Sequence, residues 1–157
     1  MTWADRLRRL AVGDPKREVA ERLLGVYQRS VVRAKQLDAD AAQAPTAGAE
    51  HELRLLADAE RSAAAALTQA LQERGTDAAA AVPAPALNGA ARNHWARLVG
   101  RLEACREARA QLLRQTPRLV ELDSSLADLL GSLLRGLDAE VLALRSLIAR
   151  ADPQALD

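Results

Sequence analysis

Apolar side chains recur every three or four residues over four long stretches of this chain, and this spacing constrains the fold more than any other feature. The stretches cover about residues 14–43, 49–74, 88–115 and 124–150. Residues three and four apart share one face of an α-helix, so each stretch predicts a helix with one apolar face. Four such helices bury their apolar faces most simply against one another, as a four-helix bundle.

The composition agrees with an all-α protein. The chain has 157 residues, a length that suits a single domain (1–157) with one hydrophobic core. Phe is absent, and the aromatic residues are Trp3, Tyr27 and Trp95. So few aromatic side chains argue against a β-sandwich and against a surface that stacks on nucleic-acid bases.

The charge balance and the cysteine content limit the partners and the compartment. The 22 basic and 21 acidic side chains give a formal net charge of +1. Nucleic acids and anionic membranes require a positive field, so we expect no binding to either. Cys105 is the single cysteine, which excludes an intrachain disulfide and favours a cytoplasmic protein. No apolar run approaches membrane-spanning length, and the amphipathic N-terminal segment differs from a signal peptide.

Capping residues and turn signals mark where the helices begin and end. Residues 1–13 are expected to form a short N-terminal helix, which precedes a bundle over residues 14–153. Asp14 followed by Pro15 predicts the start of the first long helix. Gly75 predicts the end of the second long helix.

The connections predict how the helices pair. The short segment 44–48 predicts a turn, so the first two long helices should form a hairpin. Pro117 predicts a break before the last helix, and the third and fourth long helices should form a second hairpin. The Pro- and Ala-rich segment 76–89 is long enough to run along the bundle as a crossover loop between the hairpins.

Two of the apolar rows contain a glutamate. Glu60 and Glu140 lie in the rows Leu53, Leu56, Glu60, Ala63, Leu67, Ala70 and Leu133, Leu137, Glu140, Leu144, Leu147. Each glutamate ends the tripeptide Asp-Ala-Glu, and each lies in the second helix of a predicted hairpin. Because a carboxylate is costly to bury without a partner, both positions need an explanation.

In this arrangement the chain resembles the ferritin-like four-helix bundles, the group of rubrerythrin and bacterioferritin. The resemblance covers roughly residues 14–153. It rests on the hairpin–crossover–hairpin order and on the segments LRLLADAERSAAAALTQALQERG, RNHWARLVGRLEACREARAQLL and LRGLDAEVLALRSLIARADP. It implies an antiparallel four-helix bundle of two hairpins and, by analogy, a homodimer.

The resemblance also implies where a di-iron centre would lie. In such bundles two helices each supply a Glu and the other two each supply Glu-x-x-His. Glu60 and Glu140 match the glutamates of these motifs, but Ala63 and Ala143 occupy the histidine positions. Alanine cannot coordinate a metal, so both imidazole ligands are missing. We therefore expect no catalytic residue, cofactor or metal, with Glu60, Glu140 and Glu103 as residual metal candidates.

Three environments are open for Glu60 and Glu140. Splayed helices would leave both carboxylates in solvent. Alternatively, Arg106 or Arg109 would reach them and form a buried ion pair. Third, they would retain a weak metal site.

Two neighbouring positions bear on this choice. Ser30, on the apolar stripe of the first long helix, is expected near the level of Glu60. If nothing fills the space of the missing imidazoles, a small void should lie beside Ala63 and Ala143.

The sequence thus favours a non-enzymatic ferritin-like bundle, a structural or interaction module that has lost its di-iron site. The alternative is a metalloprotein with a carboxylate-only site that binds iron or manganese weakly or acts as an oxidase. A third hypothesis is an all-helical enzyme, similar to chorismate-mutase bundles, in which arginines in a helical cavity hold carboxylates.

Overall fold

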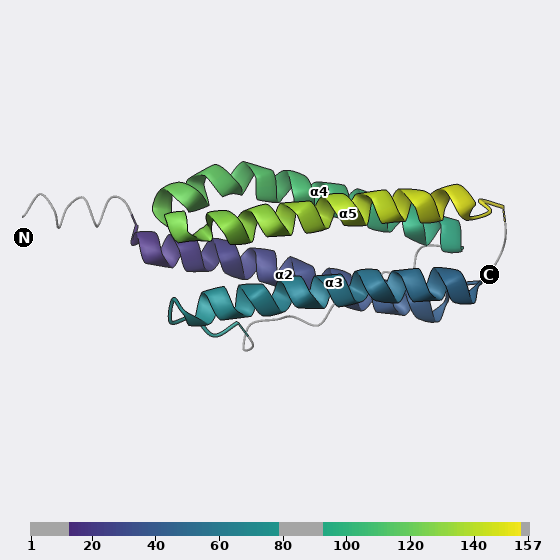
Figure 1. The fold of residues 1–157 in the computed structure, drawn as a ribbon, viewed down its shortest axis with the longest axis horizontal. Helices are drawn as coiled ribbons and strands as arrows, with labels where there is room; N and C mark the ends of the chain where they lie inside the picture. Colours follow the sequence, from purple (N-terminus) through teal and green to yellow (C-terminus); the bar gives the residue numbers. More distant parts are fainter. Residues whose placement is uncertain (1–12, 79–92, 155–157) are drawn as a thin grey trace, which may run out of the picture.

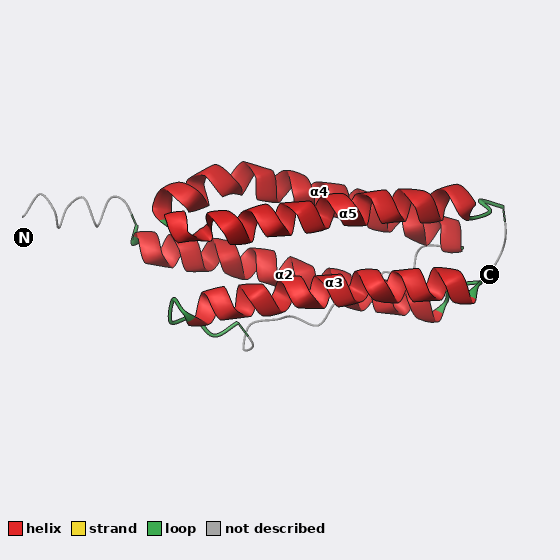
Figure 2. Cartoon of the chain, viewed as in Figure 1, coloured by secondary structure: helices red, strands yellow, loops and turns green. Residues whose placement is uncertain are grey.

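The computed structural model describes residues 13–78 and 93–154, which form four long helices (Figure 1). These are α2 (Pro15–Ala42), α3 (Ala47–Gln72), α4 (His94–Leu122) and α5 (Ala127–Arg150), with a short 3-10 helix, η2 (Ser124–Leu126), before α5. The described ranges contain no strand, which confirms the all-α prediction (Figure 2). The predicted N-terminal helix and nearly all of the predicted crossover loop lie outside the described residues.

Side-chain caps explain where the first two helices begin. The Asp14 carboxylate accepts a hydrogen bond from the backbone N–H of Lys16 at 3.0 Å, and Pro15 occupies the first turn, as predicted. Thr46 caps α3 by accepting from the N–H of Ala49 at 3.2 Å. The second long helix therefore starts two residues before its predicted position, because its cap is Thr46.

Gly75 ends α3, as the sequence predicts. Its φ of +74° lies in the left-handed region, which glycine adopts without a steric penalty. This conformation lets the N–H of Thr76 reach back to the carbonyl of Leu71 at 2.9 Å and satisfy a carbonyl at the helix end.

The predicted break at Pro117 is wrong, because α4 continues through this residue to Leu122. Proline has no N–H for the carbonyl of Leu113, but Leu113 lies on the exposed side of the helix, where water can bind that carbonyl. Beyond the proline, Leu119 is completely buried, and this packing favours continuation of the helix. The chain turns instead at Asp123, whose carboxylate accepts from the N–H of Ser125 at 3.1 Å.

The four helices share one hydrophobic core. Helix α2 packs on α3 and α4 packs on α5, while α2–α4 and α3–α5 contacts join the two pairs. The completely buried positions are mostly leucines from all four helices: Leu23, Leu37, Leu53, Leu67, Leu98, Leu119, Leu130 and Leu144. No helix among the described residues has the length and apolar character needed to cross a bilayer.

Ion pairs link the two helix pairs near their ends. Among the described residues the shortest of these at each place are Glu18–Arg118, Asp40–Arg101, Asp123–Arg74 and Glu52–Arg150, with N–O distances of 3.0, 2.7, 2.7 and 2.7 Å. The start of α2 therefore lies beside the end of α4, and the end of α2 beside the start of α4. Likewise the end of α3 lies beside the turn before α5, and the end of α5 beside the start of α3.

Candidate functional site

Glu60 and Glu140 both lie inside the bundle. Each retains 5% of its solvent exposure, so the hypothesis that splayed helices leave them in solvent is wrong. The physical reason is packing: Leu67 on α3 and Leu144 on α5, about two turns and one turn further along, share their helix faces and are completely buried. The predicted placement of both glutamates on buried faces is confirmed.

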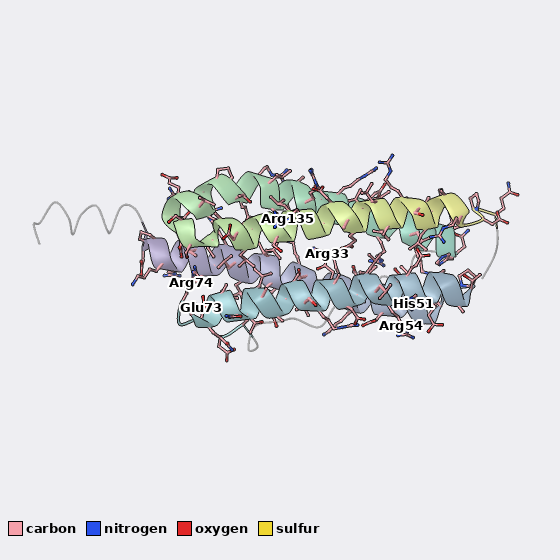
Figure 3. All side chains as sticks on the ribbon, viewed as in Figure 1. Arg33, His51, Arg54, Glu73, Arg74 and Arg135 are labelled. Atoms are coloured by element: carbon pink, nitrogen blue, oxygen red, sulfur yellow. The ribbon has the colours of Figure 1, made fainter. Side chains whose placement is uncertain are left out.

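Arg33 of α2 pairs with Glu60. Its Nε donates to Oε1 at 3.2 Å, and its Nη2 donates to Oε1 and Oε2, each at 2.9 Å. The same Nη2 also donates to the Ser30 hydroxyl at 3.4 Å. The pair is buried, and Figure 3 shows Arg33 in the middle of the bundle, between the two helix pairs. The planar guanidinium thus neutralises Glu60 with several charge-assisted hydrogen bonds.

The prediction that Arg106 or Arg109 forms a buried ion pair with Glu60 and Glu140 is wrong. Helix α4 turns Cys105 and Ala108 toward the core, and the next residue along a helix is rotated by about 100°. Arg106 is consequently exposed, and Arg109 donates to Asp138 at the surface between α4 and α5. The cation that pairs with Glu60 comes from α2 instead and is Arg33. Ser30 lies one turn before it and shares its guanidinium, which confirms the predicted position of Ser30 near Glu60.

Glu140 of α5 lies next to this ion pair. Burial and, after it, the neighbouring Glu60 carboxylate raise the pKa of its carboxyl group to about 8, against the opposing effect of Arg33. Glu140 is therefore protonated at neutral pH and is able to donate a hydrogen bond to Glu60. Arg33, ionised Glu60 and neutral Glu140 together form a buried cluster without net charge.

Cys105 of α4 completes the cluster. The side chain is fully buried, and its thiol donates to the backbone carbonyl of Leu137 at 3.6 Å. Burial and the nearby Glu140 carboxyl raise the pKa of this thiol to about 12. Because the thiolate is the nucleophilic form, Cys105 acts here as a small apolar side chain and not as a reactive group.

These side chains do not fit a di-iron centre. The Arg33 guanidinium occupies both oxygens of Glu60, and the third candidate, Glu103, is exposed. Ala63 and Ala143 are half-buried and offer no ligand atom. Within residues 13–78 and 93–154, no three His, Cys, Asp or Glu side chains are placed to hold one metal ion.

A second buried polar cluster, which the sequence did not predict, joins the end of α2 to the start of α4. Asp40 is 3% exposed and accepts from Arg101 Nε at 2.7 Å. Arg97 Nη2 donates to the carbonyl of Gln43 at 3.2 Å, and His94 is also buried here. The available signal was the spacing of Leu37, Asp40 and Ala41, since Asp40 continues the apolar stripe of α2.

The chain was also compared with known proteins. A scan against models of protein families gave no match, and a search of curated proteins found no similar sequence.

Proposed function

We propose that this protein is a non-enzymatic ferritin-like bundle, a structural or interaction module in which an arginine replaces the metal centre. The observation that carries this proposal is the buried Arg33–Glu60 pair in the middle of the bundle. Buried carboxylates need positive charge, and in ferritin-like metalloproteins the metal ions supply it. Here Arg33 supplies that charge, so the bundle core needs no metal ion for neutrality.

The ion pairs near the helix ends support the ferritin-like topology that we propose. They bring opposite ends of α2 and α4 together, and likewise of α3 and α5. In this arrangement α3 and α4 run parallel, so the end of α3 and the start of α4 lie at opposite ends of the bundle. A helix of 26 residues spans about 40 Å, while the 21 residues between Gln72 and His94 reach up to roughly 70 Å.

A carboxylate-only site for iron or manganese is the second candidate function. It is favoured by one observation, the proximity of two buried carboxyl groups, Glu60 and Glu140. A divalent cation would have to displace Arg33 from Glu60 and remove the proton from Glu140. Both steps cost free energy, so we rank this candidate below the metal-free module.

Metal analysis tests the choice between the two. Protein purified without chelators is expected to contain iron and manganese far below one ion per chain, and to oxidise added Fe(II) no faster than buffer does. Elemental analysis and an oxygen-consumption assay measure these quantities. Stoichiometric metal in the wild type that is lost in Glu140→Gln but kept in the exposed control Glu103→Gln would contradict the proposal.

We also propose a cytoplasmic homodimer. The dimer follows from the ferritin-like resemblance, and the single cysteine favours the compartment. Three large apolar side chains of the described helices, Leu55, Leu113 and Leu142, are exposed and provide apolar surface for a second copy. Light scattering on the purified chain is expected to give twice the mass of one chain. The mass of a single chain, independent of protein concentration, would exclude the dimer.

A further inference from the structure

A cavity opens on the other side of Arg33, between α2 and α4. Its volume is about 390 Å³, within the range of roughly 300–1,000 Å³ that small-molecule sites occupy. Apolar side chains from both helices form much of its wall: Val32, Ala104 and Ala108. The cavity does not include Ala63 or Ala143, so it differs from the void that the sequence predicted.

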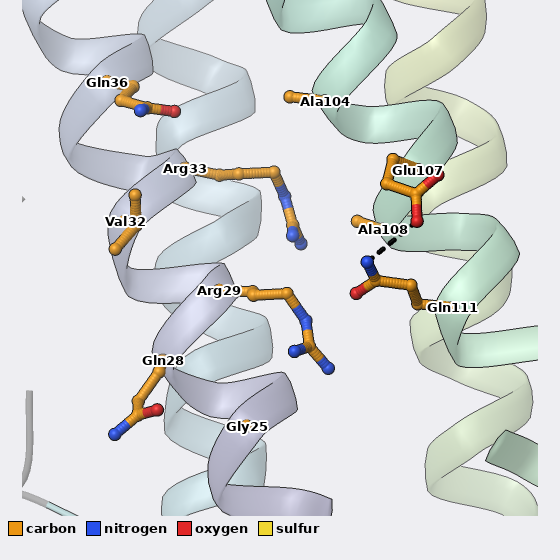
Figure 4. A pocket seen from close by; sticks show the side chains of 10 residues that line it. All are labelled: Gly25, Gln28, Arg29, Val32, Arg33, Gln36, Ala104, Glu107, Ala108 and Gln111. Carbon is orange, nitrogen blue, oxygen red and sulfur yellow. Dashed lines mark hydrogen bonds between the residues drawn. The ribbon is translucent and has the colours of Figure 1, made fainter. Parts of the chain in front are cut away.

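Two arginines line this cavity, and only one of them has a counter-ion among the described residues. Figure 4 shows Arg29 and Arg33 extending side by side from α2 toward α4. Arg33 is held by Glu60 behind it, whereas Arg29 makes no ion pair or hydrogen bond with any described residue. Arg29 is nevertheless partly buried, and its pKa is lowered by burial and by the neighbouring charge of Arg33. An arginine in such a place lacks the anion that would normally balance it.

The geometry points to an oxyanion as the missing partner of Arg29. We propose that the α2–α4 cavity binds a small organic acid, with a carboxylate or phosphate head on Arg29 and an apolar body against the alanine-rich wall. The guanidinium presents a planar fork of N–H donors that matches two oxygens of such a head group. Gln36, which also lines the cavity and has no hydrogen bond within the described part of the chain, offers a further amide donor.

Glu107 is the acidic residue on the opposite wall, and it opposes an anion. Its carboxylate accepts from Gln111 Nε2 at 2.8 Å, as the dashed line in Figure 4 shows, and from Arg114 Nη2 at 3.4 Å. These contacts and its solvent exposure partly balance its charge. The like charge still weakens the binding of an oxyanion, so removal of the Glu107 charge should tighten it.

This inference does not depend on the proposed metal-free module. It rests on the α2–α4 packing and on the charge of Arg29, and it would hold whether or not Glu60 and Glu140 bind a metal. The hypothesis of an all-helical enzyme, drawn from the sequence, also contained a helical cavity lined by arginines. The arginine proposed to bind the ligand is Arg29, and no reaction is proposed.

Binding of simple probes tests the proposal. Hexanoate, hexyl phosphate and inorganic phosphate carry the proposed head groups, and hexanol is the uncharged control of equal chain length. Titrations at constant ionic strength, followed by NMR shifts of α2 and α4 amides, are expected to saturate with hexanoate or hexyl phosphate and not with hexanol. The tighter of the two charged probes identifies the head group, and inorganic phosphate alone is expected to bind more weakly.

Variants then locate the site. Arg29→Gln is expected to lower the affinity for the charged probe by about tenfold or more, because a hydrogen-bonded charge is lost. Glu107→Gln is expected to bind the charged probe more tightly than the wild type does. The matched control is Arg17→Gln, on the same helix at the surface, where Arg17 pairs with Glu21 and the probe affinity should not change. Because Arg29 has no partner to lose, Arg29→Gln should melt at or above the wild-type temperature.

Two results would overturn the proposal. One is the absence of saturable binding by both hexanoate and hexyl phosphate. The other is binding that Arg29→Gln and Glu107→Gln leave unchanged, since the probes would then occupy a different part of the surface.

Discussion

Glu60→Ala is expected to lower the free energy of unfolding by about 3–5 kcal/mol, because it leaves the Arg33 guanidinium buried without its counter-ion. A loss of this size is a large part of the total stability of a domain, which is about 5–15 kcal/mol. Urea denaturation followed by circular dichroism measures it, provided that wild type and variant unfold with the same dependence on denaturant.

Two further variants test whether the stability lost in Glu60→Ala comes from the unpaired buried charge or merely from the loss of a glutamate side chain. Glu21→Ala removes an exposed carboxylate that pairs with Arg17 on the same helix, and it should leave stability nearly unchanged. The double variant Arg33→Met/Glu60→Leu replaces the ion pair by apolar groups and should recover most of the stability lost in Glu60→Ala. If Glu60→Ala and Glu21→Ala had equally small effects, the assignment of a buried, essential pair would be wrong.

Glu140→Gln is expected to remove most of a decline in stability between about pH 5 and pH 8. The pKa of Glu140 is about 8 in the folded protein and 4.5 in a solvated chain. Between these values the folded state keeps a proton that the unfolded state releases, so stability falls as the pH rises and levels off above about pH 8. At about 1.4 kcal/mol per pKa unit, the decline amounts to a few kcal/mol. Glutamine has a similar shape and no proton to release.

Thermal melts of wild type and Glu140→Gln from pH 5 to pH 9 measure this difference. The two should be closest in stability at pH 5, and Glu140→Gln should be the more stable protein at pH 9. The exposed Glu103→Gln serves as a control and should follow the wild-type curve. Parallel curves for wild type and Glu140→Gln would show that Glu140 is ionised in the folded protein. Carboxylates whose pKa is lowered by arginine partners, such as Glu52, stabilise the folded state when ionised. Their contribution is lost as the pH falls below this range.

The sequence predicts the helices well because their signals are local. Asp14 with Pro15 and Gly75 act through the backbone of their own turns, so their effect can be read without tertiary structure. Pro117 shows the limit of that argument. Its local preference is to end a helix, but the burial of Leu119 in the shared core outweighs it.

The partner of Glu60 could not be predicted from the same patterns. Arginine has a long side chain, and the reach of its guanidinium depends on which helix lies opposite and at what level. Arg33 follows Ser30 by one turn on α2, whereas Arg106 and Arg109 appeared closer to the stripe of α4. The sequence therefore indicates that a buried glutamate needs a cation, while only the packing of α2 on α3 identifies that cation.

The cavity at Arg29 was beyond sequence reasoning for a related reason. A missing counter-ion is a property of the whole neighbourhood, since any acidic side chain on a facing helix would have supplied it. Arg29 and Arg33 are four residues apart, a spacing that is also common between solvated side chains on helix surfaces. The spacing alone therefore does not indicate burial. Its partial burial between α2 and α4 becomes apparent only when the helices are assembled.

The ion pairs between the two helix pairs have a consequence for how the bundle responds to salt. Contacts within α2–α3 and within α4–α5 are more extensive than those across the boundary between them. That boundary carries charged links near both ends, such as Glu18–Arg118 and Glu52–Arg150, which are partly exposed and thus screened by ions. Ionic strength consequently acts on the cohesion of the two hairpins with each other more than on either hairpin, and high salt loosens the bundle along this boundary first.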